Sequence, residues 1–553
     1  MAEVQLTPLL LIFLFLLLLA FFLIGTERKL FSNSGGARLP PGPSKIPVIG
    51  NLHQLRGGLP HRVLRDLAGV HGPLMFLRLG QVDFAVVSSR DAALQITRSH
   101  DLNFAHRPQL LAPSIVLYGC SDIAFSSYGD YWHQMRRICA TELFSAKRVR
   151  SFSAIRAEEV AKLLCDAAEA AAAGQPMNVN SKLTALSNSI VSRASFGFKC
   201  HNQHAFVETM KEVLMLASGF CAADLFPSFK FVGLFSGVTS KLKKLHRKVD
   251  EILDATIKEH QSSKSEGDEE DLLDVLLRLK DDGALEIPIT FDNIKAVILD
   301  VFTGGTETSS TVVEWTISEL IRNPTVMAKA QGEVREAMMR WKNRDFDEEL
   351  LSELQYLKLV IKESLRLHPP LPLMLPRVAK EACQVLDYEV PAGTRVMINA
   401  WALGRDPLYW GSDAERFRPE RFEGGEVDYK GNHLEFVPFG AGRRICPGMA
   451  FGMATVELVL AQLLFHFDWK VPGGGEVNTA AEELDMQEAF GASVVRKEKL
   501  RLVPVLRTPA ARCLIDRRLR SLLYNINKII LAQVVTVPCS SHVVNHEVMF
   551  GHV

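Results

Sequence analysis

The stretch Pro438-Phe439-Gly440-Ala441-Gly442-Arg443-Arg444-Ile445-Cys446-Pro447-Gly448 decides how this chain of 553 residues folds. Its glycines predict a tight turn that carries one cysteine to the start of a buried, apolar helix over about 449–467. Helix N-termini and neighbouring cations favour the thiolate form of cysteine, which is the form that binds metals. Pro447 suits the first helical turn, where its missing N–H costs nothing. The stretch therefore predicts one anionic sulfur in a glycine-shaped socket.

Three uses of this sulfur can be compared. An inert buried thiol is the usual fate of an intracellular cysteine, but the flanking glycines and arginines argue against it. A structural zinc site requires about four cysteine or histidine ligands at short spacing, and no other cysteine lies near Cys446. A haem iron requires only one axial thiolate from the protein. We therefore expect Cys446 to be the axial ligand of a haem iron.

The same stretch resembles the haem-binding signature of the cytochrome P450 family, the haem-thiolate monooxygenases. The matching positions are Phe439, Gly440, Gly442, Arg444, Cys446 and Gly448. The resemblance implies a mainly α fold with small β-sheets, in a single large catalytic domain behind an N-terminal transmembrane helix. It also implies haem b (iron protoporphyrin IX) as the cofactor, with Phe439, Gly440, Arg444 and Cys446 among the residues that bind it.

A second motif lies in the middle of a long predicted helix, which Thr290 or Asp292 can cap and which Asn323-Pro324 ends. Its centre reads Gly304-Gly305-Thr306-Glu307-Thr308, and two central glycines suggest a close approach to the backbone or a local bulge. The segment resembles the family's oxygen-activation motif, with Glu307 in place of the commoner aspartate. The resemblance implies that Glu307 and Thr308 are catalytic and relay protons. The alternative is a Thr/Ser-rich face that bonds back to its own helix.

Glu363 and Arg366 place opposite charges one helical turn apart. Most such pairs are solvated surface contacts worth a few tenths of a kcal/mol, so the spacing alone is weak support. The helix ends sharply at His368-Pro369-Pro370, and Arg421 follows at the family's spacing before the cysteine. These residues resemble the buried Glu–Arg–Arg triad of the family. The resemblance implies a structural role, which is to fix the loop that holds Cys446.

Trp132 and Arg136 lie on one face of a predicted helix, and their N–H groups suit the two propionates of haem. The resemblance adds Arg377 and Arg444 as further propionate-binding candidates. A solvated surface charge is the alternative for any one of these arginines.

The substrate pocket is expected, by resemblance, to be lined by largely apolar segments, which indicates a lipophilic substrate held mainly by shape. Ordinary core packing is the alternative. The segments are Leu110–Phe125, the region around Phe220, Ala296–Gly304, Leu371–Leu375 and Ala489-Phe490.

The N-terminus predicts a membrane anchor. The apolar run Leu9–Ile24, with its neighbours, approaches the roughly 20 residues that span a bilayer. Positive charges follow the run and do not precede it, which favours a retained anchor over a cleaved signal and places the rest of the chain in the cytosol. A proline-rich hinge follows and resembles that of microsomal family members, which implies the endoplasmic reticulum. The predicted division is anchor 1–28, hinge 29–46, catalytic domain 47–507 and an atypical, poorly ordered tail 508–553.

The charge balance and the absence of cofactor-binding motifs limit which partners the chain can have. Lysine plus arginine and aspartate plus glutamate are equal at 63 each, which suggests no nucleic-acid partner. Nine scattered cysteines, without Cys-x-x-Cys, predict reduced thiols. No Walker loop or dinucleotide fingerprint occurs, so electrons must come from a partner. The resemblance names NADPH–cytochrome P450 reductase, together with O2, membrane lipid and a lipophilic small molecule.

Finer features resemble the plant clade of the family that makes specialised metabolites. These are Tyr128-Gly129-Asp130-Tyr131-Trp132 and Asp485-Met486-Gln487-Glu488-Ala489-Phe490-Gly491. The expected reaction is insertion of one oxygen atom from O2 into a terpenoid, with a diterpene favoured. Two alternatives remain: a relative on the same fold that rearranges or dehydrates its substrate, and a haem-binding membrane protein without turnover.

Overall fold

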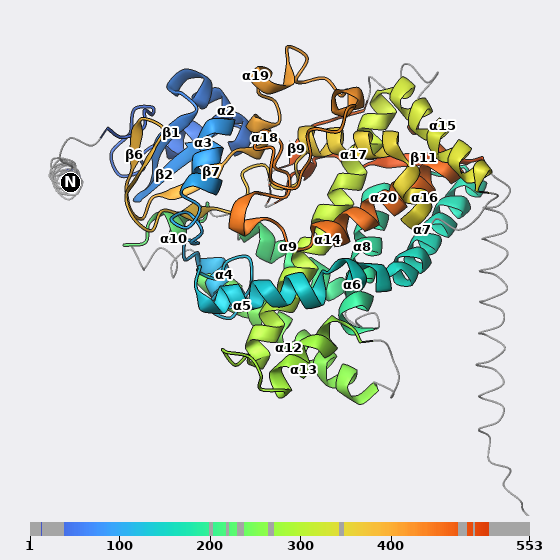
Figure 1. Ribbon diagram of the computed structural model, residues 1–553, viewed down its shortest axis with the longest axis horizontal. Coiled ribbons are helices and arrows are strands. Elements are labelled where there is room, and N and C mark those ends of the chain that lie inside the picture. Colours follow the sequence, from blue (N-terminus) through green and yellow to red (C-terminus); the bar gives the residue numbers. More distant parts are fainter. Residues whose placement is uncertain are drawn as a thin grey trace, which may run out of the picture.

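The computed structural model describes Phe13 and residues 38–197, 203–216, 220–228, 237–263, 270–341, 348–473, 484–489, 491 and 493–507. Apart from Phe13, the predicted anchor lies outside these residues, as do the hinge before Arg38 and the tail 508–553. Most strands lie at one end of the molecule beside α2 and α3, and the longer helices fill the rest (Figure 1). The predicted fold class, mainly α with small sheets, is confirmed.

The α-helices are α2 (Pro60–His71), α3 (Arg90–Leu94), α4 (Leu111–Val116), α5 (Asp130–Ile138), α6 (Ala146–Ser151), α7 (Ser153–Ala173), α8 (Val179–Phe196), α9 (Gln203–Leu216), α10 (Ala222–Leu225), α12 (Val238–Ser263), α13 (Leu272–Asp281), α14 (Phe291–Arg322), α15 (Pro324–Arg340), α16 (Glu348–Glu353), α17 (Gln355–Leu367), α18 (Ala400–Leu403), α19 (Pro407–Trp410) and α20 (Met449–His466). Short 3₁₀ turns include η4 (Pro419–Phe422) and η5 (Gly442–Arg444).

Four small sheets accompany the helices. The strands are β1 (Leu74–Leu79), β2 (Val82–Val87), β3 (Met177–Asn178), β4 (Arg377–Val378), β5 (Cys383–Val385), β6 (Tyr388–Val390), β7 (Arg395–Ile398), β8 (Phe467–Lys470), β9 (Glu488–Ala489), β10 (Val495–Arg496) and β11 (Arg501–Leu506). Their orders are β1-β2-β7-β4, β3-β11-β8, β5-β6 and β9-β10. The β1–β2 hairpin pairs Leu74 with Val87. β2 pairs with β7 in parallel.

α14 runs through the middle of the molecule and organises the helical part (Figure 1). Thr290 begins it with a capping box in which Thr290 and Asn293 satisfy each other's backbone N–H groups, as the sequence predicted for Thr290. The helix is α-helical throughout, so the predicted bulge is absent from this described segment. Gly305 explains the close approach instead, because an added Cβ there would lie 2.8 Å from Val191 of α8.

α20 is the apolar helix expected after the cysteine. Within the described residues it is the one helix long and apolar enough to cross a membrane, but 67% of it is buried in the core. Gly448 is its N-cap and Met449 its first residue, so the prediction that Pro447 lies in the first turn is wrong. The turn around Cys446 is therefore extended by two residues before the helix begins.

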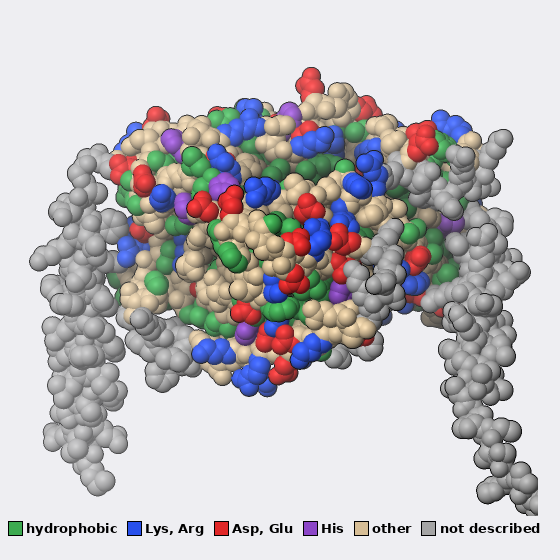
Figure 2. All heavy atoms as spheres, turned by 60° about the horizontal axis from the view of Figure 1, so that its bottom comes forward, with side chains coloured by type: hydrophobic (Ala, Val, Ile, Leu, Met, Phe, Trp, Pro, Cys, Tyr) green, Lys and Arg blue, Asp and Glu red, His purple; other side chains and the backbone are tan. Residues whose placement is uncertain are grey.

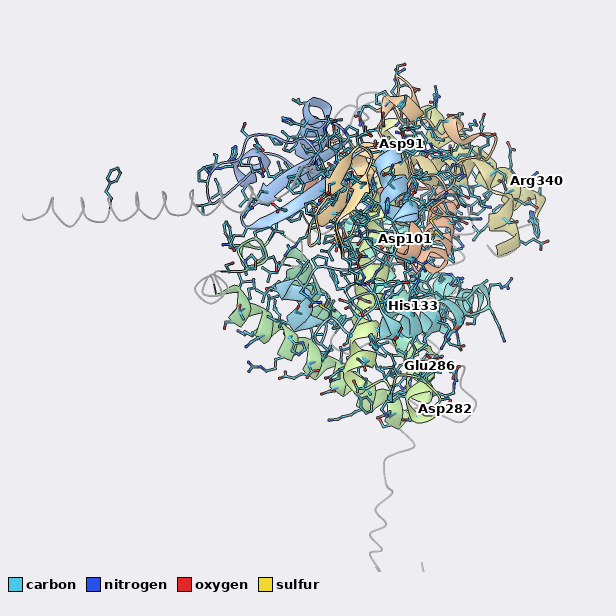
Figure 3. The ribbon with its side chains drawn as sticks, turned by 60° about the vertical axis from the view of Figure 1, so that its left-hand side comes forward. Asp91, Asp101, His133, Asp282, Glu286 and Arg340 are labelled. Atoms are coloured by element: carbon cyan, nitrogen blue, oxygen red, sulfur yellow. The ribbon has the colours of Figure 1, made fainter. Side chains whose placement is uncertain are left out.

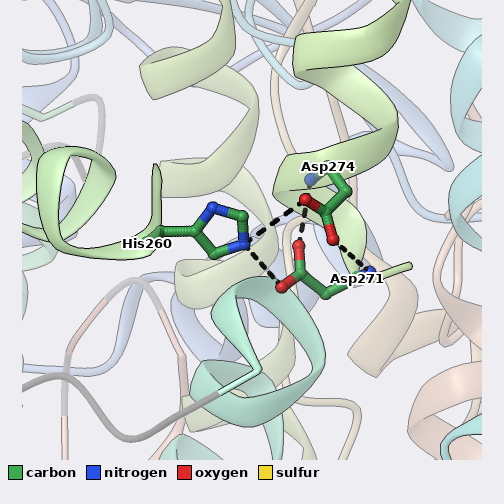
Figure 4. Close-up of side chains that lie close together, drawn as sticks. All are labelled: His260, Asp271 and Asp274. Atoms are coloured by element: carbon green, nitrogen blue, oxygen red, sulfur yellow. Dashed lines mark hydrogen bonds and ion pairs between the residues drawn. The ribbon is translucent and has the colours of Figure 1, made fainter. Parts of the chain in front are cut away.

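Charged side chains of both signs are interspersed over the face shown in Figure 2. Beneath such surface charges, His260 at the end of α12 reaches α13, where Nε2 lies 2.7 Å from Asp271 Oδ2 and 3.6 Å from Asp274 Oδ1 (Figure 4). Asp271 and Asp274 also form a capping box through their other oxygens. Both carboxylates are thus already used by a helix cap and a helix-to-helix ion pair, which explains the cluster without a metal.

Candidate active site

The cysteine loop is held in a shape that requires glycine. The Cys446 N–H donates to the Phe439 carbonyl at 2.9 Å, and the Gly448 N–H donates to the Cys446 sulfur. Gly442 has φ +65°, and a Cβ there would lie 2.3 Å from the Thr97 carbonyl oxygen. Any other side chain would clash with this carbonyl, so the close packing of the cysteine loop on Thr97 requires glycine at position 442.

Asp101, labelled in Figure 3, ties the same loop to the body of the protein. Its carboxylate accepts the Arg443 backbone N–H at 3.0 Å and an Arg377 N–H at 3.3 Å. Arg377 also donates to the Ala441 carbonyl at 2.7 Å. Arg377, placed by the sequence among the cofactor-binding candidates, therefore also fixes the cysteine loop.

The environment of Cys446 does not by itself favour the thiolate. Burial raises the pKa of the thiol, and the opposing effects of the Gly448 N–H and of Arg136 are smaller. The expectation that a backbone N–H at the helix start and a nearby cation favour the thiolate holds in direction, but the effect of desolvation on the pKa is larger. A coordinated metal ion deprotonates a thiol directly.

Four arginines gather around this loop, and we call them the arginine cluster: Arg107, Arg136, Arg377 and Arg444. Burial lowers the pKa of each of them. For Arg444, burial and then repulsion from Arg377 lower the pKa to about 10. Among the described residues, the Arg136 guanidinium has no hydrogen bond or ion pair within the protein. The cluster thus holds more positive charge than the nearby carboxylates of Asp101 and Asp122 neutralise.

Trp132 and Arg136 share α5, as the sequence predicted. The Trp132 indole N–H donates to the Ile123 carbonyl at 3.1 Å, and the Arg444 guanidinium lies over its ring at 4.4 Å. Trp132 therefore positions Arg444, and its N–H is already used. Phe439 packs edge-to-face on Tyr429, with 5.4 Å between the ring centroids, and Gly440 has φ +78°.

The middle of α14 presents one partly exposed face, although the helix is otherwise buried. Phe302, Thr306 and Ser309 are buried. Asp300, Thr303, Glu307 and Thr308 are half-buried and recur at helical spacing on one side of the helix. Gly304 on the same side is exposed, and Gly305, which faces Val191, is half-buried.

On α14 most hydroxyls of the Thr/Ser-rich segment bond back to their own helix, and one of them is placed where it could also relay protons. The Thr308 hydroxyl donates back to the Gly304 carbonyl, and Ser310, Thr316 and Ser318 bond to their own helix in the same way. The last three are buried. Only Thr308 lies on the partly exposed face, so it is the hydroxyl that can exchange this bond for another partner.

Glu363, Arg366 and Arg421, which we call the glutamate triad, come together in the core. Arg366 donates to both Glu363 oxygens at 2.7 and 2.8 Å, and Arg421 Nε donates to Glu363 Oε1 at 2.9 Å. Arg366 also donates to the Gly404 and Ala414 carbonyls. The triad joins α17 to the segment that precedes the cysteine loop. Arg421 also pairs with Asp413 at 3.5 Å, so two carboxylates face the two guanidinium groups.

Comparison with known proteins identifies the family. A model of the family described as Cytochrome P450 matches residues 40–506. The chain belongs to the cytochrome P450 family. It is 50% identical over 500 residues to premnaspirodiene oxygenase of Hyoscyamus muticus, covering 89% of this chain and 97% of that protein. It is 49% identical to desmethyl-deoxy-podophyllotoxin synthase of Sinopodophyllum hexandrum (89% and 96% covered) and to 5-epiaristolochene 1,3-dihydroxylase of Nicotiana tabacum (89% and 97% covered).

A solved structure, zebra fish cytochrome P450 with progesterone, shares the fold at a TM-score of 0.69 and 26% identity, covering 81% of this chain and 99% of that chain. The relatives are plant P450s, several of them terpenoid-modifying, so the predicted plant specialised-metabolism clade is confirmed. The chain is accordingly a P450 monooxygenase with haem as its cofactor.

The residues of this P450 fit haem on three observations. One cysteine sulfur stands alone in a glycine loop, as a haem-thiolate protein requires. The arginine cluster has an excess of positive charge, which suits a ligand with two carboxylates. The central face of α14 is open where the rest of the helix is buried.

Several residues of this P450 site escaped the sequence-based prediction. Asp101, Arg107, Asp122 and Asp300 lie in loops or alone in an apolar helix, and no spacing links them. Asp300 gave one usable signal, since it interrupts the apolar run of a helix predicted to be buried. Of the predicted pocket segments, Leu371–Leu375 is half-buried apart from Pro372. Phe490 lies outside the described residues.

Proposed function

We propose that this P450 is a single-pass, membrane-anchored enzyme of the endoplasmic reticulum, with a cytosolic catalytic domain, that oxidises a terpenoid with electrons from NADPH–cytochrome P450 reductase. The observation that carries the substrate class is 50% identity to premnaspirodiene oxygenase across 97% of that relative. The apolar character of the half-buried segment 371–375 supports it. Within this class the sequence favours a diterpene.

The proposed roles follow the geometry. Cys446 ligates the haem iron, and Arg136, Arg377 and Arg444 bind the propionates, with Trp132 holding Arg444 in place. Phe439 and Gly440 shape the cysteine loop, and the glutamate triad supports it from behind. Haem, when bound, supplies the oxygen activation and the one-electron chemistry.

Glu307 and Thr308 are proposed to move protons. With haem bound, Thr308 would exchange its bond to the Gly304 carbonyl for a bond on the partly exposed face and donate its proton there, and Glu307 would return that proton from water.

The exposed Arg137 and Arg443 support docking of a reductase with an acidic face. Both lie beside the cysteine loop, on the path to the haem. We expect charge reversal at Arg137 to slow reduction at low salt, and an unchanged rate there would count against this docking surface.

The test uses the full chain in microsomes with reductase. The reduced carbon monoxide difference spectrum comes first, and a strongly red-shifted Soret band is expected from an axial thiolate. Sesquiterpene, diterpene and lignan substrates are then compared by NADPH consumption and product formation, with Cys446→Ser as the control. Turnover of a terpenoid supports the proposal. Turnover of the lignan alone, which the podophyllotoxin relative makes a fair competitor, overturns it.

A further inference from the structure

Two aspartates, Asp122 and Asp300, bring their carboxyl groups close together beside the arginine cluster. Asp122 is completely buried, and Asp300 extends from the central part of α14. Two carboxylates in contact repel each other strongly if both are ionised. Such a pair is most stable when it holds one proton between the two acids.

The pair accepts consecutive backbone N–H groups of loop 122–126. Asp300 Oδ2 accepts the N–H groups of Ile123 at 2.7 Å and Ala124 at 3.0 Å. Asp122 Oδ2 accepts the N–H of Phe125 at 2.8 Å. The backbone N–H groups of this loop therefore donate to the two aspartates, and those to Asp300 attach the loop to α14.

The carbonyl groups of the same loop accept hydrogen bonds from Trp132 and from two members of the arginine cluster. Ile123 accepts from Trp132 and from Arg444, the latter at 3.2 Å. Arg444 also donates to the Ser126 carbonyl at 2.7 Å, and Arg107 donates to the Ala124 carbonyl at 2.8 Å. Loop 122–126 is thus the physical link between the aspartate pair and the haem-edge cations.

The backbone just before the loop is strained. Tyr118, Gly119 and Cys120 have φ values of +48°, +74° and +61°. Non-glycine residues hold such values only where the surrounding structure determines them. The strain shows that the conformation of the loop is imposed by its contacts and not by local preference.

We propose that the Asp122–Asp300 pair is the positioning device of the haem edge, and that its single proton, carried by Asp300, holds loop 122–126 so that Arg444, supported by the Trp132 ring, faces the haem carboxylates. This inference rests on the proposed roles of Trp132 and Arg444, but it is independent of the substrate. Asp300 is assigned the proton because Asp122 is stabilised as the anion by Arg107 and lies close to Arg444.

Other ionisable groups face the pair from each packed element. They are Arg107, Arg444, Tyr131 of α5, Cys120 and Cys139. Burial raises the pKa of the tyrosine and of both thiols, so these three stay neutral. Burial lowers the pKa of both arginines, that of Arg444 to about 10, so Arg444 stays charged near neutral pH. Burial raises the pKa of Asp122 to about 6, and burial together with Asp122 raises that of Asp300 well above its usual range.

The sign of the pH dependence follows. An acid whose pKa is higher in the folded state binds more protons there than when unfolded, so its contribution to stability falls as pH rises above about 4. Replacing the protonated acid by a neutral amide of the same shape removes this fall in stability. The stability of such a variant relative to the parent should therefore increase as pH rises.

Asp300→Asn is the decisive variant, because its amide oxygen can accept both N–H groups while its NH2 donates to Asp122. We expect haem retention, measured by transfer to excess apomyoglobin, within about twofold of the parent. The midpoint of thermal unfolding should rise relative to the parent from pH 5 to pH 9. Asp300→Leu leaves two N–H groups unpaired and should speed haem loss at least about tenfold.

Asp122→Asn is the matched control. The introduced NH2 can donate to an ionised Asp300, so the negative charge moves from position 122, where Arg107 stabilises it, to Asp300 on α14, and haem loss should be faster than in Asp300→Asn. The proposal is overturned if Asp300→Asn fails to fold, if it loses haem as fast as Asp300→Leu, if the two asparagine variants behave alike, or if the stability difference does not change with pH. None of these readouts needs a substrate, so failure of the terpenoid assignment leaves them unaffected.

Discussion

The two buried groups of arginines in this molecule differ in how their charge is balanced. In the glutamate triad, both arginines donate to Glu363 at 2.7–2.9 Å and to backbone carbonyls, so little is left unsatisfied. In the arginine cluster, repulsion between neighbours helps to lower the pKa of Arg107 and Arg444. A balanced group is complete within the protein, whereas an unbalanced one is completed by an added anion. The difference distinguishes a structural cluster from a binding site.

Breaking the balanced group should have the largest effect. Arg366→Leu would leave buried Glu363 with only the hydrogen bonds from Arg421 and from the Arg418 backbone N–H, and removal of one partner from a buried pair costs about 3–5 kcal/mol. We expect a large fall in the yield of folded protein and in the thermal midpoint, with and without haem.

The control for this prediction is Arg340→Leu on α15, where the side chain is 69% exposed and its ion pair with Glu353 spans 3.8 Å. Exposed pairs of this kind contribute about 0–1 kcal/mol. Equal losses in the two variants would show that burial and matching do not govern the triad.

A second balanced group allows the comparison to be tested by pH. Burial opposes ionisation of Glu488, but the His61 hydrogen bond at 3.0 Å and the charges of His61 and Arg62 lower its pKa to about 2. An unfolded glutamate has a pKa near 4.3, so the pair contributes roughly 3 kcal/mol that is present above pH 4.3 and is lost as pH falls toward 2.

Glu488→Gln should therefore be less stable than the parent near pH 6, and the gap in thermal midpoint should narrow as pH approaches 3. Glu415→Gln is the control, since Glu415 is also ion-paired but is 61% exposed, and its gap should be small throughout. A gap for Glu488→Gln that stays constant over this range would contradict the assignment.

The unbalanced group should respond in the opposite sense. Arg136→Met removes a cation that has no partner among the described residues, so the haem-free protein should be as stable as the parent or slightly more so. Haem, however, loses a charged contact, and its dissociation should speed up about tenfold. Arg137→Met, its exposed neighbour on α5, should change neither quantity. Loss of stability in haem-free Arg136→Met would assign this arginine to structure.

The contrast also explains what the sequence could predict. Cys446, the glutamate triad and the capped helix over 290–323 carry contiguous or regularly spaced signals, and each appears in the structure. The predicted start of α20 at Met449 is confirmed, but Pro447 was wrongly placed in its first turn, because a proline before the N-cap and a proline in the first turn look alike in sequence.

Burial and pairing across loops could not be predicted. The pKa of Cys446 depends on how much water is removed around the sulfur, which only the packed structure determines. Asp122, Asp300 and Arg107 come from three separate segments, and their contacts arise from tertiary packing. Glu363 was predictable because its partners follow a motif, whereas Asp300 has no motif partner.

The smallest effect is expected at the C-terminal end of the chain. The last described contacts belong to β11 and to Arg507, whose N–H donates to the His466 carbonyl at 3.0 Å and whose side chain pairs with Asp468. Both are kept if the chain is stopped after Arg507, so the variant that lacks 508–553 should retain haem content, thermal midpoint and the red-shifted carbon monoxide band. Stopping after Lys499 is the contrasting variant, because it removes β11 and with it the order β3-β11-β8. If the longer variant lost haem as completely as the shorter one, residues 508–553 would belong to the folded unit, and the proposed boundary at 507 would be wrong.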